Sequence, residues 1–210
     1  MELLIQLYKI TSKSGREDKI KSFLLDCLKD IPIQIETDSI GNLFITKGQV
    51  DTYPCIAAHL DEIHTPCKRE IVIDNDTIYA VDEMWNRVGC GADDKNGLWI
   101  AINLLRSEPI LKVALFVQEE KLGAIAGCRG ANACNLSFFD DVKYILECDH
   151  KGAHDVVSIG KGDVQLCDSN FIPQTILDKY DYQMVCGGKT DVVALKMRGL
   201  KIPVCNISCG

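Results

Sequence analysis

Amphipathic helical spacing recurs in three stretches of the chain. The first covers residues 1–30, where hydrophobic positions repeat at helical intervals and polar residues at 12–15 interrupt the pattern. The other two stretches are residues 96–106 and 191–198, and Gly199 directly after the last one fits a helix C-cap. The pattern therefore predicts an N-terminal pair of helices and two further helices.

Strand-like segments lie between these helices. Alternating polar and apolar residues predict paired strands at 32–37 and 43–46, and a hairpin over residues 69–81 with Asn75 near its turn. Short apolar runs, typical of strands buried on both faces, cover residues 53–59, 111–117, 144–148 and 202–208. Strands that alternate with helices favour one domain over residues 1–210, a three-layer α/β/α fold with a central, largely parallel mixed sheet.

Histidine and carboxylate residues follow the buried runs. They are His59 at the end of the first run with Asp61 just after it, Asp93 before the 96–106 helix, Glu119 and Glu120 after the second run, and Asp149 after the third. The carboxyl ends of parallel strands meet at one edge of a sheet, where open α/β folds bind ligands. Imidazole and carboxylate groups are zinc ligands, so the sequence predicts a metal site at this edge.

Such a residue set suits two zinc ions about 3.5 Å apart, which together polarise a carbonyl group and activate a water molecule. Asp93 is placed to share its carboxylate between the ions, and Asp61 to orient the His59 ring. Adjacent side chains of an extended strand end point in opposite directions. One of Glu119 and Glu120 can therefore bind metal while the other serves as general base.

Four sequence strings resemble the metal-site motifs of the zinc aminopeptidase and carboxypeptidase clan, which includes peptidase T, tripeptide aminopeptidases and related deacylases. The strings are AAHLDEIH, GADDKNG, VQEEKLGAIAG and ECDHKG. The resemblance implies the following roles: His59 and Asp149 bind one zinc, Asp93 bridges, Glu120 binds the second zinc, Glu119 is the general base, and Asp61 orients His59. It also implies a cis peptide bond between Asp93 and Asp94.

Two features depart from that family. The segment after Asp149 is too short for the lid or dimerisation domain that many relatives carry there, and the sequence stops at Gly210, before the His that binds the second zinc in relatives. We therefore expect a second site that is short of one ligand unless His64, His150 or His154 supplies it. Otherwise these three histidines are expected on the loop surface.

The expected activity is metal-dependent hydrolysis of an amide bond in short peptides, of the aminopeptidase or di/tripeptidase type, with cobalt or manganese as alternatives to zinc. Three other functions stay open: an N-acyl amino acid deacylase, a truncated, catalytically silent metal-binding homologue, and a redox or thiol-rich binding protein. The substrate-binding residues and the oligomeric state are not defined by the sequence.

Charge and cysteine content narrow the class of protein. The formal net charge of −7 and the absence of a Lys/Arg cluster argue against a nucleic-acid partner. The 11 cysteines are odd in number and lie mainly in apolar runs, and the start of the chain lacks a signal-peptide pattern. We therefore expect a cytoplasmic protein with reduced thiols and no membrane association. Lys95, in the polar loop after Asp93, is interpreted as surface charge.

Overall fold

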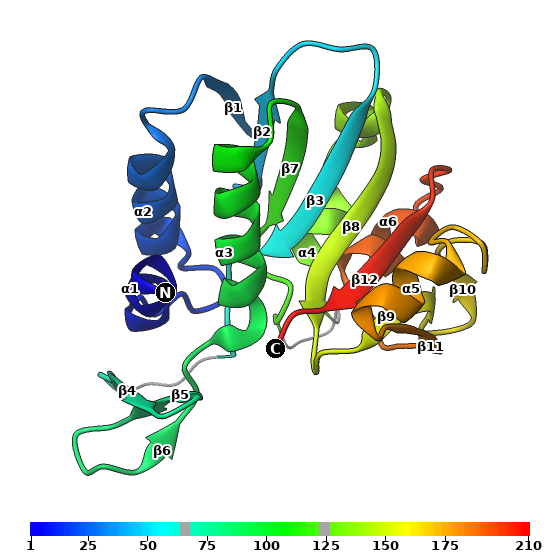
Figure 1. Cartoon of the computed structure of the whole chain (residues 1–210). Coiled ribbons are helices and arrows are strands. Elements are labelled where there is room, and N and C mark those ends of the chain that lie inside the picture. Colours follow the sequence, from blue (N-terminus) through cyan, green and yellow to red (C-terminus); the bar gives the residue numbers. More distant parts are fainter. Residues whose placement is uncertain (64–67, 122–126) are drawn as a thin grey trace.

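The computed structural model describes residues 1–63, 68–121 and 127–210. A nine-stranded sheet forms the centre of the molecule, with strand order β1-β2-β7-β3-β8-β12-β9-β10 and β11 paired to β9 (Figure 1). Its strands are β1 (Ile33–Thr37), β2 (Leu43–Lys47), β3 (Tyr53–His59), β7 (Leu111–Phe116), β8 (Val142–His150), β9 (Asp155–Gly160), β10 (Val164–Gln165), β11 (Gln183–Cys186) and β12 (Val204–Ser208).

The four central strands, β7, β3, β8 and β12, run parallel to one another. Antiparallel pairs flank them: β1 with β2 and β2 with β7 on one side, β12 with β9 and β9 with β10 on the other. β3 and β7 are mostly apolar, and all six residues of β7 are buried. Burial on both faces explains their continuous hydrophobic runs.

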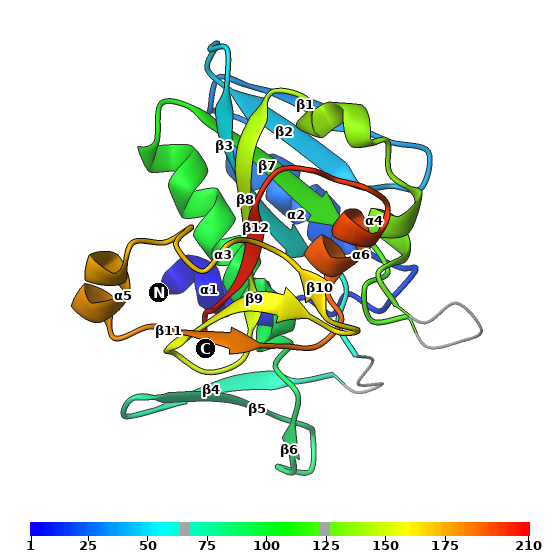
Figure 2. The ribbon, with the colours of Figure 1, turned by 90° about the vertical axis from the view of Figure 1, so that its right-hand side faces the viewer.

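Helices cover both faces of the sheet, as the two views at right angles show (Figures 1 and 2). One face carries α1 (Glu2–Lys9), α2 (Asp18–Leu28) and α3 (Ala92–Ser107), and α5 (Gln174–Tyr180) packs on the same face nearer the β9 edge. The other carries α4 (Arg129–Ala133), α6 (Asp191–Met197) and a 3-10 turn, η1 (Leu136–Phe139). The three-layer α/β/α fold with a largely parallel central sheet is therefore confirmed.

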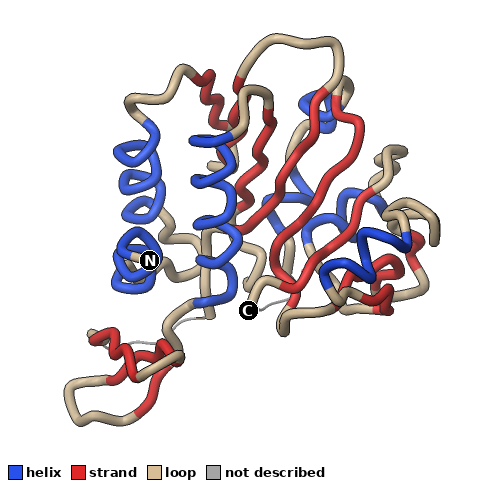
Figure 3. The backbone as a smooth tube through the Cα atoms, in the orientation of Figure 1, coloured by secondary structure: helices blue, strands red, loops and turns tan. Residues whose placement is uncertain are grey.

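A separate three-stranded antiparallel sheet projects from the main domain (Figure 3). It consists of β4 (Glu70–Asp74), β5 (Thr77–Val81) and β6 (Arg87–Val88). The hairpin predicted over residues 69–81 is confirmed, and Asn75 adopts φ 51° at its turn, a conformation that asparagine tolerates better than most residues.

A buried ionic cluster connects this small sheet to the main domain. The Glu62 carboxylate accepts hydrogen bonds from Lys95 Nζ at 2.6 Å and Arg69 Nη2 at 3.0 Å. Arg69 also donates to the backbone carbonyls of Tyr8 and Ile10 on and after α1. The interpretation of Lys95 as surface charge was wrong: the residue is 1% exposed, because its carboxylate partner lies inside the protein.

Other boundaries differ from the sequence pattern. Helix α3 begins at Ala92 instead of residue 96, and its first turn has non-helical backbone angles at Asp93 and Asp94. The short elements β9, β10, β11 and α5 were not predicted, because they are brief and mostly of mixed polarity. No helix among the described residues is long and apolar enough to cross a bilayer.

Candidate metal centre

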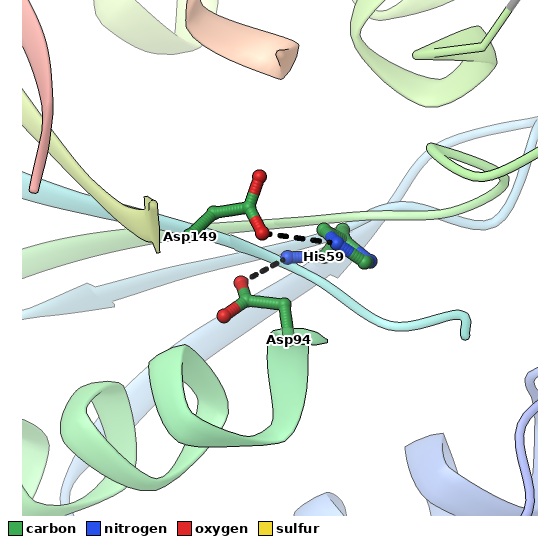
Figure 4. A group of neighbouring side chains, drawn as sticks. All are labelled: His59, Asp94 and Asp149. Atoms are coloured by element: carbon green, nitrogen blue, oxygen red, sulfur yellow. Dashed lines mark hydrogen bonds and ion pairs between the residues drawn. The ribbon is translucent and has the colours of Figure 1, made fainter. Parts of the chain in front are cut away.

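The carboxyl ends of β3, β7 and β8 lie near the first turn of α3, and the predicted site residues converge there. His59, the last residue of β3, is 2% exposed. Its Nε2 atom lies 2.8 Å from Asp93 Oδ1 and 3.3 Å from Asp149 Oδ1. Figure 4 shows Asp149 reaching the ring from β8 while Asp94 approaches the His59 backbone from the start of α3. One imidazole nitrogen is thus surrounded by carboxylate oxygens from two other segments.

Asp94 joins this group although it was not among the predicted ligands. One oxygen from each of Asp94 and Asp149 and a ring nitrogen of His59 lie within 4.8 Å of one another. Both Asp94 oxygens already accept backbone hydrogen bonds, Oδ2 from the His59 N–H and Oδ1 from the Gly97 N–H, each at 3.0 Å. Asp94 therefore connects β3 to the first turn of α3. The peptide bond between Asp93 and Asp94 is cis, as the resemblance implies.

Asp61 organises the other side of the site. Its two carboxylate oxygens accept the consecutive backbone N–H groups of Glu119 and Glu120 at 2.8 and 3.0 Å. His59 Nδ1 lies 2.9 Å from the Asp61 carbonyl oxygen and 3.5 Å from its Oδ1 atom. The carboxylates of Glu119 and Glu120 come within 4.8 Å of a ring nitrogen of His59. Asp61 therefore fixes both the imidazole and the Glu-Glu segment.

The concentration of carboxylates perturbs the acid–base properties of the site. Burial alone would lower the pKa of His59, but the charge of Asp149 and hydrogen bonds to carboxylates raise it well above its usual value. Burial raises the pKa of Asp149 to about 6 despite the opposing charge of His59. Burial and the nearby charge of Asp93 raise the pKa of Glu120 to about 7. Negative groups are therefore held close together at a cost that a bound cation would remove.

The donor set fits a zinc-type ion. Nitrogen and carboxylate oxygens are the donors that such ions take, and a ring nitrogen of His59 lies within 4.8 Å of carboxylate oxygens of Asp94 and Asp149. Asp93 has a side chain that is 63% exposed, whereas His59 is buried. An ion held here would therefore be anchored from inside the protein and reachable from solvent.

Four polar residues that were not predicted as part of the site contact or influence its members. Asn206 on β12 accepts the Asp149 N–H through Oδ1 at 3.0 Å. Glu147 and Asp191 are each 1% exposed. Burial raises the pKa of both carboxyl groups, and the charges of Asp149 and Glu119 respectively add to the increase. The thiol of Cys128 donates to Glu119 Oε1 at 2.9 Å. Periodicity could not indicate these contacts, because each joins segments that are distant in sequence or separated by a loop.

The remaining histidines lie away from the ring of His59. His150 Nε2 is 3.7 Å from Asp155 Oδ2, and its side chain is partly exposed. His154 is exposed and its Nδ1 lies 2.8 Å from the Asp181 carbonyl oxygen. His64 falls outside the described residues. The expected loop-surface position was therefore wrong for His150, which ends β8 and is only partly exposed, whereas His154 is exposed as expected.

Comparison with known proteins places this arrangement among peptidase folds. No family model matches the chain. A TET aminopeptidase from the marine sediment archaeon Thaumarchaeota archaeon superposes with a TM-score of 0.71 at 14% identity, covering 99% of this chain and 88% of that one. A tripeptidase from Staphylococcus aureus gives 0.63 at 19% identity, covering 76% and 45%. Aminopeptidase PepT from Bacillus cereus gives 0.61 at 22% identity, covering 75% and 44%.

The chain spans less than half the length of the tripeptidase and of PepT, and most of the length of the TET aminopeptidase. At these identities the likeness establishes the fold. The resemblance drawn from the metal-site motifs is confirmed at that level: this chain shares the fold of these peptidases.

Proposed function

We propose that the protein is a metal-dependent peptidase that hydrolyses an amide bond near the free amino end of short peptides. The observation that carries this proposal is the convergence on His59 of Asp93 and Asp149, with Glu119 and Glu120 held alongside by Asp61. The likeness in fold to a tripeptidase and to aminopeptidases supports a peptide substrate.

The proposed ligands are His59 and Asp149 for one ion, Asp93 as the shared carboxylate, and Glu120 for a second ion. Zinc is the proposed metal, with cobalt or manganese as substitutes in the same donor set. When bound, such ions polarise the scissile carbonyl and make a water molecule a stronger acid. Asp94 is proposed to hold the His59 backbone, because its two oxygens are already engaged by N–H groups.

Glu119 is proposed as the general base. Its carboxylate is close to the His59 ring, and its backbone is fixed by Asp61, so it can accept a proton from the attacking water and pass it to the leaving amine. Burial and the nearby charge of Asp93 raise the pKa of Glu120, and a cation bound beside its carboxylate would lower that pKa again.

Replacing Glu119 by Gln tests the assignment. The variant should keep its zinc content, because Glu119 is not a proposed ligand, while hydrolysis of an unblocked tripeptide falls at least ~100-fold. Glu36→Gln, at an exposed position on β1, is the matched control and should keep full activity. Undiminished hydrolysis by the Glu119 variant would show that another group is the base.

The same assay separates the two hydrolytic alternatives. The wild-type protein should turn over unblocked di- and tripeptides faster than N-acetylated amino acids. Preference for the N-acetylated compounds would favour the deacylase, and zinc binding without turnover of either substrate would favour the catalytically silent homologue.

A further inference from the structure

Residues 127–130 pair with the segment that contains Glu119. Backbone N–H groups of Gly127, Cys128, Arg129 and Gly130 donate in turn to the carbonyl oxygens of Lys121, Glu119, Gln118 and Val117. The bond from the Cys128 N–H to the Glu119 carbonyl measures 2.8 Å. This pairing places the side chain of Cys128 directly beside that of Glu119.

The Cys128 side chain then makes a second contact with the same residue. Its sulfur lies 2.9 Å from Glu119 Oε1, and the residue is 0% exposed. Burial and the negative charges of Asp191 and Glu119 raise the pKa of the thiol, so it stays protonated and acts as a hydrogen-bond donor. Glu119 is therefore fixed at its N–H by Asp61, and at its carbonyl and one carboxylate oxygen by Cys128.

We propose that Cys128 is a positioning residue, whose thiol orients the Glu119 carboxylate for proton transfer. The inference rests on the proposed role of Glu119 as general base. The hydrogen bond from Cys128 to Oε1 restricts rotation of the Glu119 carboxylate. An oxygen of the same carboxylate lies within 4.8 Å of a His59 ring nitrogen. Restricting a catalytic group to its productive orientation lowers the barrier of the chemical step without changing substrate affinity.

Ala and Ser at position 128 separate positioning from packing. Cys128 adopts φ 52°, and neither replacement is β-branched, so both face the same backbone requirement. Cys128→Ala removes the donor and should lower kcat about tenfold, equivalent to ~1.4 kcal/mol, with KM and zinc content unchanged. Cys128→Ser keeps a donor and should retain kcat to within about twofold.

Cys134→Ala is the control for loss of a buried thiol. Cys134 lies at the other end of α4 and is 2% exposed, but its sulfur contacts Ala131 and Arg198 instead of Glu119. This variant should keep wild-type kcat. Equal kcat for the Ala, Ser and wild-type forms at position 128 would overturn the positioning role, and so would equal losses in the Ala and Ser forms.

Infrared spectroscopy of the S–H stretch provides a readout that does not depend on catalysis. The S–H band present in wild type and absent from Cys128→Ser should shift to higher frequency in Glu119→Ala, because the acceptor is lost. An unchanged band would overturn the inference whatever the kcat values of the Cys128 variants. A shifted band in a protein that hydrolyses no peptide would instead confirm the thiol contact, while refuting the proposed function and with it the positioning role.

Discussion

Replacing Glu62 by Gln should destabilise the whole domain. In the native protein the Glu62 carboxylate accepts from Lys95, Arg69 and the Ser12 N–H, and the three charged side chains are each at most 3% exposed. Gln keeps the shape and one acceptor oxygen but removes the negative charge between two buried cations.

Removing one partner of a buried ion pair costs about 3–5 kcal/mol. Because Gln retains some hydrogen bonding, we expect the free energy of unfolding to fall by ~3 kcal/mol, the lower end of that range. For a chain of this size, 1 kcal/mol shifts Tm by roughly 2–4 °C, so the expected fall is about 6–12 °C. Thermal unfolding followed by circular dichroism at pH 7 measures it.

The matched control is Asp18→Asn. Asp18 also forms an ion pair, 3.7 Å from Lys21, but its side chain is 94% exposed, so the pair should contribute well under 1 kcal/mol. Adding Lys95→Met to Glu62→Gln should recover part of the lost stability by removing one unpaired buried cation. A Tm for Glu62→Gln within about 2 °C of the control would show that the buried charge of Glu62 contributes little to stability.

Three further outcomes are expected. Asp61→Asn leaves one oxygen for two N–H groups, and zinc affinity measured by competition with a chelator should fall about 10- to 100-fold. The pKa of Asp149 is higher in the folded metal-free protein than in the unfolded chain, so its stabilising effect is present at low pH and lost as pH rises through about 6. Between pH 5 and 8, the Tm of metal-free Asp149→Asn should therefore fall by less than the Tm of the metal-free wild type. Gly130→Ala brings a Cβ against Asn42 and within 2.6 Å of the Val117 carbonyl oxygen. It should lower the free energy of unfolding, measured with denaturant, by about 1–3 kcal/mol. Gly188→Ala, whose Cβ meets nothing within 4 Å, should lower it little.

Much of the fold follows from local pattern. The buried runs at 53–59 and 111–117 predicted β3 and β7 because strands covered on both faces are continuously apolar. Polar residues after those runs predicted where His59 and Glu119 lie, since parallel strands end at one sheet edge. The helix at 191–198 corresponds to α6, which ends at Met197.

What the pattern could not provide is pairing between distant residues. Lys95 looks like a surface residue because its loop is polar, and only the fold brings Glu62 to it from 33 positions away. Asp94 was not among the predicted ligands, and its bond to the His59 N–H depends on how α3 meets β3. The contact between Cys128 and Glu119 depends likewise on the return of the chain after the loop.

The proposal of a peptidase depends on metal held at His59. Its most direct test is a zinc titration of the metal-free protein, with hydrolysis of an unblocked tripeptide measured at each step and His59→Ala carried in parallel. Wild-type activity should be absent without metal and rise with zinc occupancy, while the variant stays inactive and binds less zinc. Hydrolysis that is independent of zinc, or equal in the two proteins, would contradict the account.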